Sequence, residues 1–386
     1  MANTKDFKVK NGIQPTVYHE GLGTVNTSGS TATLDLSTGS VFEITPTSDI
    51  QVNLSNPAAS AIVSQATLLL DGAELLNNTW DISTAVYSQN YSIGYSEGLP
   101  EDIFFSPDGI YMYVIGDSNN RVYRYTLTTA WDISTVSGSN YFSVGPRQTE
   151  PKGLFFKTDG TKMYVIGTVS PRNVDEYNLS TAWDVTTASF NQDFSTSSQD
   201  TQPKSLSFKS DGTKMYIAGT SGQDINEYNL STAWNISTAS FNQNFSVGSA
   251  SSFATGLFFK PDGTKMYVTS DSNNDVDEYN LSTAWNISTA SFNQHFSVST
   301  QETAPNGLFF KPDGTNMYVI GDHGDDVNQY TIGSSSTATI TYPNTIEFAG
   351  GTAPTSPAIG ETDILTFSTR DGGSTYQGVL AIDGAK

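Results

Sequence analysis

The chain of 386 residues has no cysteine, which excludes disulfides and thiolate metal sites. It has few charged residues, 15% of the total, and its 18 Lys and Arg residues are outnumbered by 39 Asp and Glu residues, for a formal net charge of -21. Such an acidic chain is not expected to bind nucleic acid or an anionic membrane surface. It also lacks an apolar run long enough to span a bilayer and a signal peptide in its opening MANTKDFKVKNG. We therefore expect neither membrane insertion nor classical secretion.

Tryptophan is scarce too, but its five occurrences are evenly spaced. Each is followed 28 residues later by an Asp-Gly pair, and both series step by 51, 52, 51 and 51 residues. The tryptophans are Trp80, Trp131, Trp183, Trp234 and Trp285. A period near 50 residues is typical of a propeller or a solenoid. We interpret the tryptophans, and the Met-Tyr pairs that recur at one phase of the repeat, as packing positions between repeats.

Each repeat contains four predicted strands. In the fourth repeat, apolar runs at residues 257–259 and 266–268 flank the polar turn 261–264, as in an antiparallel hairpin. Residues 276–281 and 291–298 supply the third and fourth strands. Four short strands in roughly 50 residues are typical of one propeller blade.

The phase of the repeats predicts how the ring closes. The chain enters with a fourth-type strand at residues 84–93 and leaves after a third-type strand at residues 326–332. We therefore predict an all-β fold containing a five-bladed β-propeller, with four strands per blade and the last blade closed by the N-terminal strand. Closure removes the free sheet edges that invite aggregation.

The flanks predict a second domain. Residues 23–75 and 334–386 are rich in Thr and Ser and contain short strand patterns, so we expect a split β-sandwich-like domain. The propeller, residues 76–333, is inserted into it, because a propeller brings its own ends together. Residues 1–22 are interpreted as an N-terminal attachment arm, with a disordered terminus as the alternative.

Two segments of the flanks carry a family resemblance: LDLSTGSVFEITPTSDIQVNLSNP and ATITYPNTIEFAGGTAPTSPAIGETDILTFSTRDGGSTYQGVLA. They resemble the β module near the ends of tail-fibre-type and other virion structural proteins of marine tailed bacteriophages, and the opening FKVKNGI resembles the start of such fibre proteins. The blade motif KPDGTKMYV, residues 260–268, is similar to the YVTN and lactonase-like propeller superfamily. The second resemblance implies a fold more than an activity.

The first resemblance implies a location and partners. It implies a virion protein, assembled in the host cytoplasm, that contacts other virion proteins through the attachment arm and the split β domain. It also implies a homo-oligomer, such as a trimer. On this basis we expect a tail fibre or similar appendage, and the alternative is a capsid or tail decoration protein with no host-binding role.

The loops between the second and third strands of each repeat differ most between repeats, and the repeat geometry places them on one rim. A rigid scaffold that presents variable polar loops is typical of a recognition surface. We therefore predict that they contact a host-surface glycan or protein. The candidate contact residues are Asn119, Asn120, Arg121, Ser170, Arg172, Asn173, Gln223, Asp224, Asn273, Asn274, Asp275, His323, Asp325 and Asp326.

No catalytic constellation emerges from the sequence. The three histidines, His19, His295 and His323, lie in unrelated segments. The innermost strands begin near a mixed set of residues, Glu101, Lys152, Lys204, Thr255 and Asn306, unlike the channel carboxylates that the lactonase-like resemblance implies. We predict no enzyme activity and no cofactor, and a lactonase-like hydrolase is the less favoured alternative.

One acidic loop, residues 271–277, has alternating carboxylates and amides that suggest a calcium ion. However, Val276 stands where an EF-hand loop needs glycine, and Ser282 stands where it needs glutamate. We interpret the segment as a solvated loop, and a structural cation stays the alternative.

Overall fold

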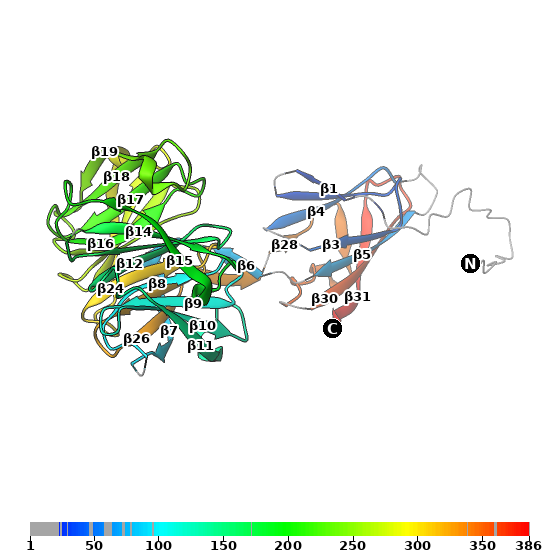
Figure 1. Ribbon diagram of the computed structural model, residues 1–386. Coiled ribbons are helices and arrows are strands. Elements are labelled where there is room, and N and C mark those ends of the chain that lie inside the picture. The colour runs from blue at the N-terminus through cyan, green and yellow to red at the C-terminus, as the bar shows by residue number, and fades with distance from the viewer. Residues whose placement is uncertain are drawn as a thin grey trace. The chain divides into compact units, whose positions relative to one another are not determined.

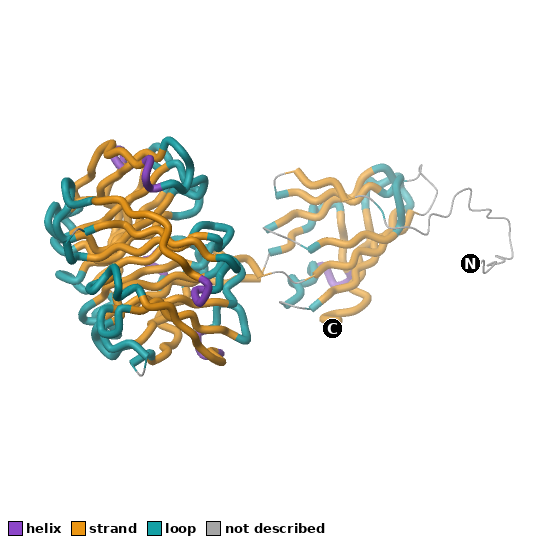
Figure 2. Tube along the Cα trace, in the orientation of Figure 1, coloured by secondary structure: helices purple, strands orange, loops and turns teal. Residues whose placement is uncertain are grey.

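The computed structural model describes residues 23–385 except 24, 29, 46–48, 58–63, 72–73, 78, 95, 171, 338 and 359–360. The predicted attachment arm, residues 1–22, lies outside the described residues. The described residues form strands and six short 3₁₀ turns with no α-helix, so the all-β fold class is confirmed (Figure 2). They divide into two compact units, Asn78–Ser334 and Met1–Asn77 with Ser335–Lys386.

The unit Asn78–Ser334 is a five-bladed β-propeller made of five four-stranded antiparallel sheets, as predicted (Figure 1). Blade 1 contains β8 (Pro100–Phe105), β9 (Tyr111–Gly116), β10 (Arg121–Leu127) and β11 (Val136–Ser143). Blade 2 contains β12 (Pro151–Phe156), β13 (Lys162–Gly167), β14 (Asn173–Leu179) and β15 (Ala188–Ser195). Blade 3 contains β16 (Pro203–Phe208), β17 (Lys214–Gly219), β18 (Asp224–Leu230) and β19 (Ala239–Ser246). Blade 4 contains β20 (Ala254–Phe259), β21 (Lys265–Ser270), β22 (Asp275–Leu281) and β23 (Ala290–Ser297).

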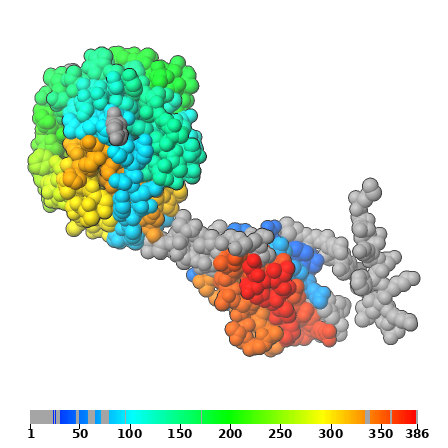
Figure 3. Space-filling model, turned by 90° about the horizontal axis from the view of Figure 1, so that it is seen from below, coloured from blue at the N-terminus to red at the C-terminus, as the bar shows by residue number. Residues whose placement is uncertain are grey.

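Blade 5 is built from both ends of the propeller segment. It contains β24 (Pro305–Phe310), β25 (Asn316–Gly321), β26 (Asp326–Thr331) and, as its outer strand, β7 (Val86–Ser92). β7 pairs antiparallel with β26, from Asp326 opposite Ser92 to Thr331 opposite Val86. Cyan and orange surfaces lie side by side at this seam in Figure 3. The predicted closure by the N-terminal strand is therefore confirmed.

The first strand of every blade contacts the first strands of its two neighbours, so these strands form the inner ring around the propeller axis. The aromatic side chains near the ends of these strands pack against neighbouring blades. Phe105 of blade 1, for example, stacks on Trp131 at 5.4 Å between ring centroids and meets Tyr318 of blade 5 in a tilted contact at 4.4 Å. The five methionines that share one phase of the repeat are fully buried, which agrees with their predicted packing role.

The tryptophans join each blade to the next through the turn that precedes a one-turn 3₁₀ segment. The 3₁₀ segments of the propeller are η1 (Ile82–Thr84), η2 (Ile133–Thr135), η3 (Val185–Thr187), η4 (Ile236–Thr238) and η5 (Ile287–Thr289). The Trp183 amide donates to the carbonyl of Gly160 at 3.0 Å, and the Tyr113 hydroxyl of blade 1 donates to the Trp183 carbonyl at 2.7 Å. Trp80 makes the corresponding contacts with Gly314 of blade 5 and Tyr267 of blade 4. Trp80 therefore belongs to the closing blade.

The second unit contains two sheets that both flanks of the propeller build together. One sheet contains β1 (Val25–Ser28), β2 (Thr31–Asp35), β4 (Ile50–Ser55) and β28 (Ile340–Thr341). The other contains β29 (Ile346–Phe348), β31 (Tyr376–Ala385), β30 (Thr362–Thr369), β5 (Ser64–Asp71) and β3 (Val41–Ile44). Their shared core includes Leu34, Val52, Leu68 and Phe367. Two short strands, β6 (Glu74–Asn77) and β27 (Ser334–Thr337), pair with each other where the chain leaves and re-enters this unit.

Candidate functional site

The two faces of the propeller differ in how much their loops vary among the five repeats. In an antiparallel blade, the connection from the second to the third strand and the connection to the next blade lie at the same end of the sheet. Together these connections form what we call the variable face. Its loops are residues 117–120, 168–172, 220–223, 271–274 and 322–325, with residues 93–99, 144–150, 196–202, 247–253 and 298–304. The opposite face repeats the Asp-Gly and tryptophan turns with little change.

Backbone contacts hold the loops of the variable face in place. The last residue of each second-to-third-strand loop has a positive φ of 50° to 59°, at Asn120, Arg172, Gln223, Asn274 and Asp325. The carbonyl of each of these residues accepts an amide from the start of the adjacent interblade loop, as Asn120 does from Val144 at 2.9 Å. This position has a structural requirement, because a left-handed backbone favours Asn or Asp among side chains other than glycine.

The predicted contact residues occupy three levels of exposure. Asn119, Ser170, Gln223, Asn273 and His323 are exposed, and Asn120, Arg121, Arg172, Asn274 and Asp325 are half-buried. Several also fix neighbouring loops: the Asn119 amide donates to the Ser96 carbonyl at 2.9 Å, and the Arg172 Nε donates to the Thr201 carbonyl at 2.7 Å. The exposed and half-buried residues therefore lie on one face, although they do not converge on one point.

The other four predicted residues are buried. Asn173, Asp224, Asp275 and Asp326 begin the third strand of their blades and are 5–9% exposed. Asp224 accepts hydrogen bonds from Asn226 at 2.7 Å and Asn244 at 2.6 Å, and the Asn173 amide donates to Asp193. Side chains buried to this degree do not reach a macromolecular surface. They support the loops from within instead.

The inner strands begin on the variable face, at the mouth of the axial channel. Charged side chains lie near these strand starts, as the sequence predicted. The second residues of the inner strands meet here, and Lys152 donates from Nζ to the Glu101 carboxylate and to Asp117 Oδ2 at 2.9 Å. Glu101 and Lys152 are buried, whereas Asp117 is half-buried. We call this group, with Lys204, Asn306 and Asp322, the channel mouth.

The other members of the channel mouth connect blades. Asn306 donates to the Pro100 carbonyl of blade 1 at 3.0 Å and to Asp322 Oδ1 at 3.0 Å. Lys204 is half-buried and makes no hydrogen bond or ion pair with another residue in the described part of the chain, although its charge acts on Glu101 and Asp322. Lys204 is therefore a cation available to a ligand at the mouth.

Burial controls the charges of the channel mouth. It raises the pKa of Glu101 to about 7, since the loss of water outweighs the attraction of Lys152. Burial opposes the charge of Lys152, but Glu101 and Asp117 outweigh this effect and raise the pKa of that lysine. Burial also raises the pKa of Asp322, against the attraction of Lys152. The mouth thus keeps the Lys152 ammonium group while Glu101 is partly protonated near neutral pH.

Below the mouth the channel is apolar. A cavity of about 170 Å³ is lined mainly by the inner strands and contains the rings of Phe104, Phe155, Phe258 and Phe309. Ser207 occupies the corresponding position of blade 3. The rings of Phe104 and Phe309 meet edge to face at 5.2 Å. Charged ligands are therefore expected at the mouth and not deeper along the axis.

The interblade loops contribute functional surface that the sequence analysis missed. Leu99 and Phe253 occupy equivalent loop positions and are 43% and 51% exposed, next to the loops that carry the predicted residues. Their partners in the other three repeats are Glu150, Gln202 and Ala304. Comparison of the interblade loops across the five repeats could have found this variation, because it is as large as that of the predicted loops.

No group of three or more His, Cys, Asp or Glu residues is arranged to hold a metal ion among the described residues. None of the described helices is long and apolar enough to cross a membrane. In the loop 271–274 the Asn273 amide instead donates to the Ala250 carbonyl at 2.6 Å.

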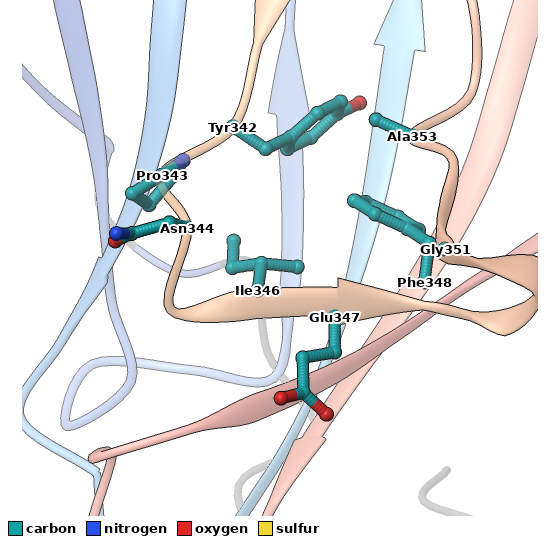
Figure 4. Close-up of a pocket in the computed structure, with 8 residues that line it drawn as sticks. All are labelled: Tyr342, Pro343, Asn344, Ile346, Glu347, Phe348, Gly351 and Ala353. Atoms are coloured by element: carbon teal, nitrogen blue, oxygen red, sulfur yellow. The ribbon is translucent and has the colours of Figure 1, made fainter.

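A separate open pocket of about 410 Å³ lies in the second unit, in the segment TYPNTIEFAGG that is part of the quoted resemblance (Figure 4). Tyr342 and Phe348 meet edge to face at 5.0 Å and line it with Ile346. Glu347 points to the other side of β29, where it accepts from Gln377 Nε2 at 2.8 Å. The pocket therefore offers a mixed polar and apolar surface that includes two aromatic rings.

Comparisons with known proteins give structural likeness only. No family model matches the chain, and no curated protein matches it. A putative 6-phosphogluconolactonase from Bacteroides uniformis is 12% identical, with 61% of this chain and 68% of that chain covered and a TM-score of 0.39. A periplasmic gluconolactonase from Pseudomonas aeruginosa is 17% identical, with 63% and 70% covered and a TM-score of 0.37. A protein from Lactobacillus plantarum is 17% identical, with 63% and 72% covered and a TM-score of 0.39. These values assign neither activity nor substrate to this chain.

Proposed function

We propose that the protein is a non-catalytic binding protein whose propeller recognises a ligand through its variable face. One observation carries the proposal: variation among the five repeats is concentrated in loops on this face, while the strands and the opposite face stay nearly constant. A uniform scaffold with locally varied, exposed loops suits recognition, because loops change without disturbing the core. The exposed Leu99 and Phe253 supply apolar anchors beside polar groups, a combination favoured in binding surfaces.

The proposed setting is a bacteriophage particle, and it rests on the resemblance of the flanks to tail-fibre-type virion proteins. In this setting the second unit and the segment 1–22 attach to other virion proteins. The variable face contacts a host-surface glycan or protein. Assembly as a homo-oligomer, such as a trimer, presents several such faces at once and strengthens weak individual contacts.

The test is binding of the fluorescently labelled full-length protein to candidate host cells. The variant Leu99→Ser with Phe253→Ser removes two exposed apolar side chains and leaves the buried contacts of the loops in place. We expect saturable binding by the unchanged protein and roughly a ten-fold weaker apparent affinity for the variant, since both substitutions remove apolar surface from the proposed contact.

A matched control changes the opposite face. Ala233→Gln with Ala284→Gln alters two exposed residues in the nearly constant loops and is expected to bind as the unchanged protein does. If both variants lost binding to the same degree, the variable face would not be the specific binding surface. Failure of the intact, folded protein to bind any candidate cell would contradict the receptor role and favour a decoration protein.

A further inference from the structure

Five equivalent positions of the inner strands line the apolar part of the channel, and four of them hold a phenylalanine. Phe104 meets both Phe155 and Phe309 edge to face at 5.2 Å between ring centroids. Phe258 meets Phe309 in the same way, also at 5.2 Å. The fifth position, in β16 of blade 3, is Ser207. Because β16 contacts β12 and β20, Ser207 stands between Phe155 and Phe258 and interrupts the circle of rings.

Each of the four phenylalanines also contacts a tryptophan and a second phenylalanine of the next blade. The tryptophans stack on them at 6.2–6.5 Å, in the pairs Phe104 with Trp183, Phe155 with Trp234, Phe258 with Trp80 and Phe309 with Trp131. The tilted contacts to the next blade lie at 5.3–5.4 Å, in the pairs Phe104 with Phe156, Phe155 with Phe208, Phe258 with Phe310 and Phe309 with Phe105. The complete arrangement therefore surrounds one phenyl ring with four others.

Blade 3 keeps these four neighbours but lacks the ring that they would surround. By the repeat, a phenyl group at position 207 would contact four rings that all line the cavity of about 170 Å³: Phe155, Phe258, Phe259 and Trp285. Phe104 and Phe309, which have both neighbours in the circle, are only 9% and 8% exposed. Phe155 and Phe258, which flank Ser207, are half-buried. The cavity thus has the position and the walls of one missing aromatic ring.

The cavity is large enough for such a ring and is open to solvent. An apolar cavity of about 150 Å³ in another protein is sufficient to bind benzene. The turns between the first and second strands of blades 2, 3 and 4 contribute Thr158, Ser210 and Pro261 to the lining, and all three residues are exposed. These turns lie on the face opposite the variable face. A ligand can therefore enter there without crossing the charged channel mouth.

We propose that the cavity beside Ser207 binds a small molecule through one aromatic ring, which takes the place of the missing phenyl group. The bound ring stacks on Trp285 and meets Phe155 and Phe258 edge to face. These contacts favour an aromatic ring over a saturated ring of similar size, because they depend on the ring quadrupole as well as on buried area. The ligand class is an uncharged monocyclic aromatic compound, since the cavity walls are mainly apolar. This second site goes beyond the proposed receptor role.

The test is a fluorine NMR titration of the full-length protein with 4-fluorophenol, a soluble probe with a single ring. We expect one saturable site with a dissociation constant on the order of 1 mM, as for a small fragment. Cyclohexanol should compete with the probe roughly five-fold less well than phenol does, because it lacks the aromatic contacts. Absence of saturable binding would overturn the site, and equal competition by the two alcohols would overturn its preference for aromatic rings.

Variants at Ser207 test where the probe binds. Ser207→Phe fills the cavity as the other blades do and is expected to abolish binding, with near-UV circular dichroism as the check of tertiary packing. If this variant does not fold, Ser207→Leu fills part of the cavity and should weaken binding roughly ten-fold. Undiminished binding in the folded, filled variant would overturn the assignment to blade 3.

Ser207→Ala is the matched control, because it keeps the cavity and removes only the hydroxyl. It is expected to bind the probe as the unchanged protein does. Loss of binding in this variant would show that the hydroxyl, and not the space for a ring, holds the ligand, which would overturn the proposal. The titrations use no host cell and leave the variable face unchanged, so their outcome is independent of the proposed receptor role.

Discussion

Each propeller tryptophan has an unusual backbone conformation, and its amide and carbonyl form hydrogen bonds with different blades. The φ angles of these residues are 62° to 68°, in the left-handed region that large side chains rarely adopt. The amide of each tryptophan bonds a glycine of its own blade, and its carbonyl accepts a tyrosine hydroxyl of the neighbouring blade, as with Gly160, Trp183 and Tyr113. Bonds on both sides of the residue therefore offset the local strain.

The glycine under each tryptophan should tolerate no side chain. Gly160 has a φ of +72°, and a Cβ there would lie 2.4 Å from Trp183 Cε2. We expect Gly160→Ala to lower the free energy of unfolding by about 2–4 kcal/mol, from left-handed backbone strain and overpacking. Urea unfolding followed by tryptophan fluorescence measures this.

Gly138→Ala is the matched control, because a Cβ at Gly138 meets no atom within 4 Å and its φ is not positive. A change below about 0.5 kcal/mol is expected there, as for ordinary surface substitutions. Equal destabilisation by both variants would contradict the role given to the tryptophan contact.

For single residues, the sequence predicted that a side chain packs between repeats better than it predicted which residues that side chain touches. Even spacing showed that the tryptophans pack between repeats, but it did not show which Asp-Gly turn each one touches. Trp131 precedes Asp159 by 28 residues, yet its amide bonds Gly109, which lies 22 residues before it. Likewise Asp224 and Asn173 stand in variable segments, but their strand position turns them inward. Strand pairing decides whether a side chain points inward or outward. The repeat period alone does not carry this information.

Among the secondary-structure elements, the 3₁₀ segments act as connectors between blades. Each begins with an Asp or Asn cap, and four of the five caps also accept the amide of a glutamine from the outer strand of the preceding blade. These pairs are Gln89 with Asp132, Gln192 with Asn235, Gln243 with Asn286 and Gln294 with Asp81, at 2.8–3.0 Å. Between blades 1 and 2, Arg124 of β10 contacts the cap instead, with Nη1 3.3 Å from Asp184 Oδ1.

The closing element should be the weakest part of the ring, because β7 and η1 join blade 5 without covalent continuity to β26. Trp80→Ala removes the side chain that packs this element against Phe310 at 5.6 Å between centroids. We expect a loss of about 3–5 kcal/mol, as for other large aromatic deletions. Hydrogen exchange of the β7 amides should also become selectively faster.

Trp234→Ala is the control, since Trp234 is buried to nearly the same degree, 8% exposed against 7% for Trp80. Its blade is continuous in sequence, so a similar loss of stability should come without selective exchange in β19. Selective exchange of the outer strand in both variants would show that the seam is no weaker than the other blades.

Strand number and closure were predictable from the sequence because repeated turn signals mark each strand end. The one-turn 3₁₀ segments were not predicted, although the Trp-Asp/Asn-Ile/Val-Ser/Thr pattern repeats at every one of them. A three-residue helix has no periodicity to detect. Its signal is the capping residue, which the repeats supply in the form Asp or Asn followed two residues later by Ser or Thr.

Across the whole propeller, the blades differ in their polar residues mainly at positions where packing restricts the choice of side chain least. Ion pairs between a half-buried lysine and a buried glutamate recur in three blades, at Lys162 with Glu176, Lys214 with Glu227 and Lys265 with Glu278. The channel mouth and the interblade loops instead change from blade to blade. A ring of similar blades can therefore carry a different chemical group at each position around its axis. The channel mouth arises from such departures from the repeat, and only contact geometry shows which departures meet.

The second unit should be a single domain that both flanks of the propeller build together. Its core joins residues from both flanks, since β30 pairs antiparallel with β5 and β28 pairs parallel with β4. β6 and β27 pair directly, so the chain ends left by removing the propeller lie beside each other. Replacement of residues 78–333 by an Asn-Gly turn should therefore close β6 and β27 into a hairpin and leave a cooperatively folding β protein.

Thermal unfolding followed by far-UV circular dichroism measures this, with residues 335–386 alone as the control. The control lacks β2, β4 and β5, which supply Leu34, Val52 and Leu68 to the core, so no cooperative transition is expected from it. A cooperative transition of the isolated C-terminal flank, or none in the joined protein, would contradict a single domain split by the propeller. The first outcome would make the flanks independent units, and the second would make the propeller a required part of their core.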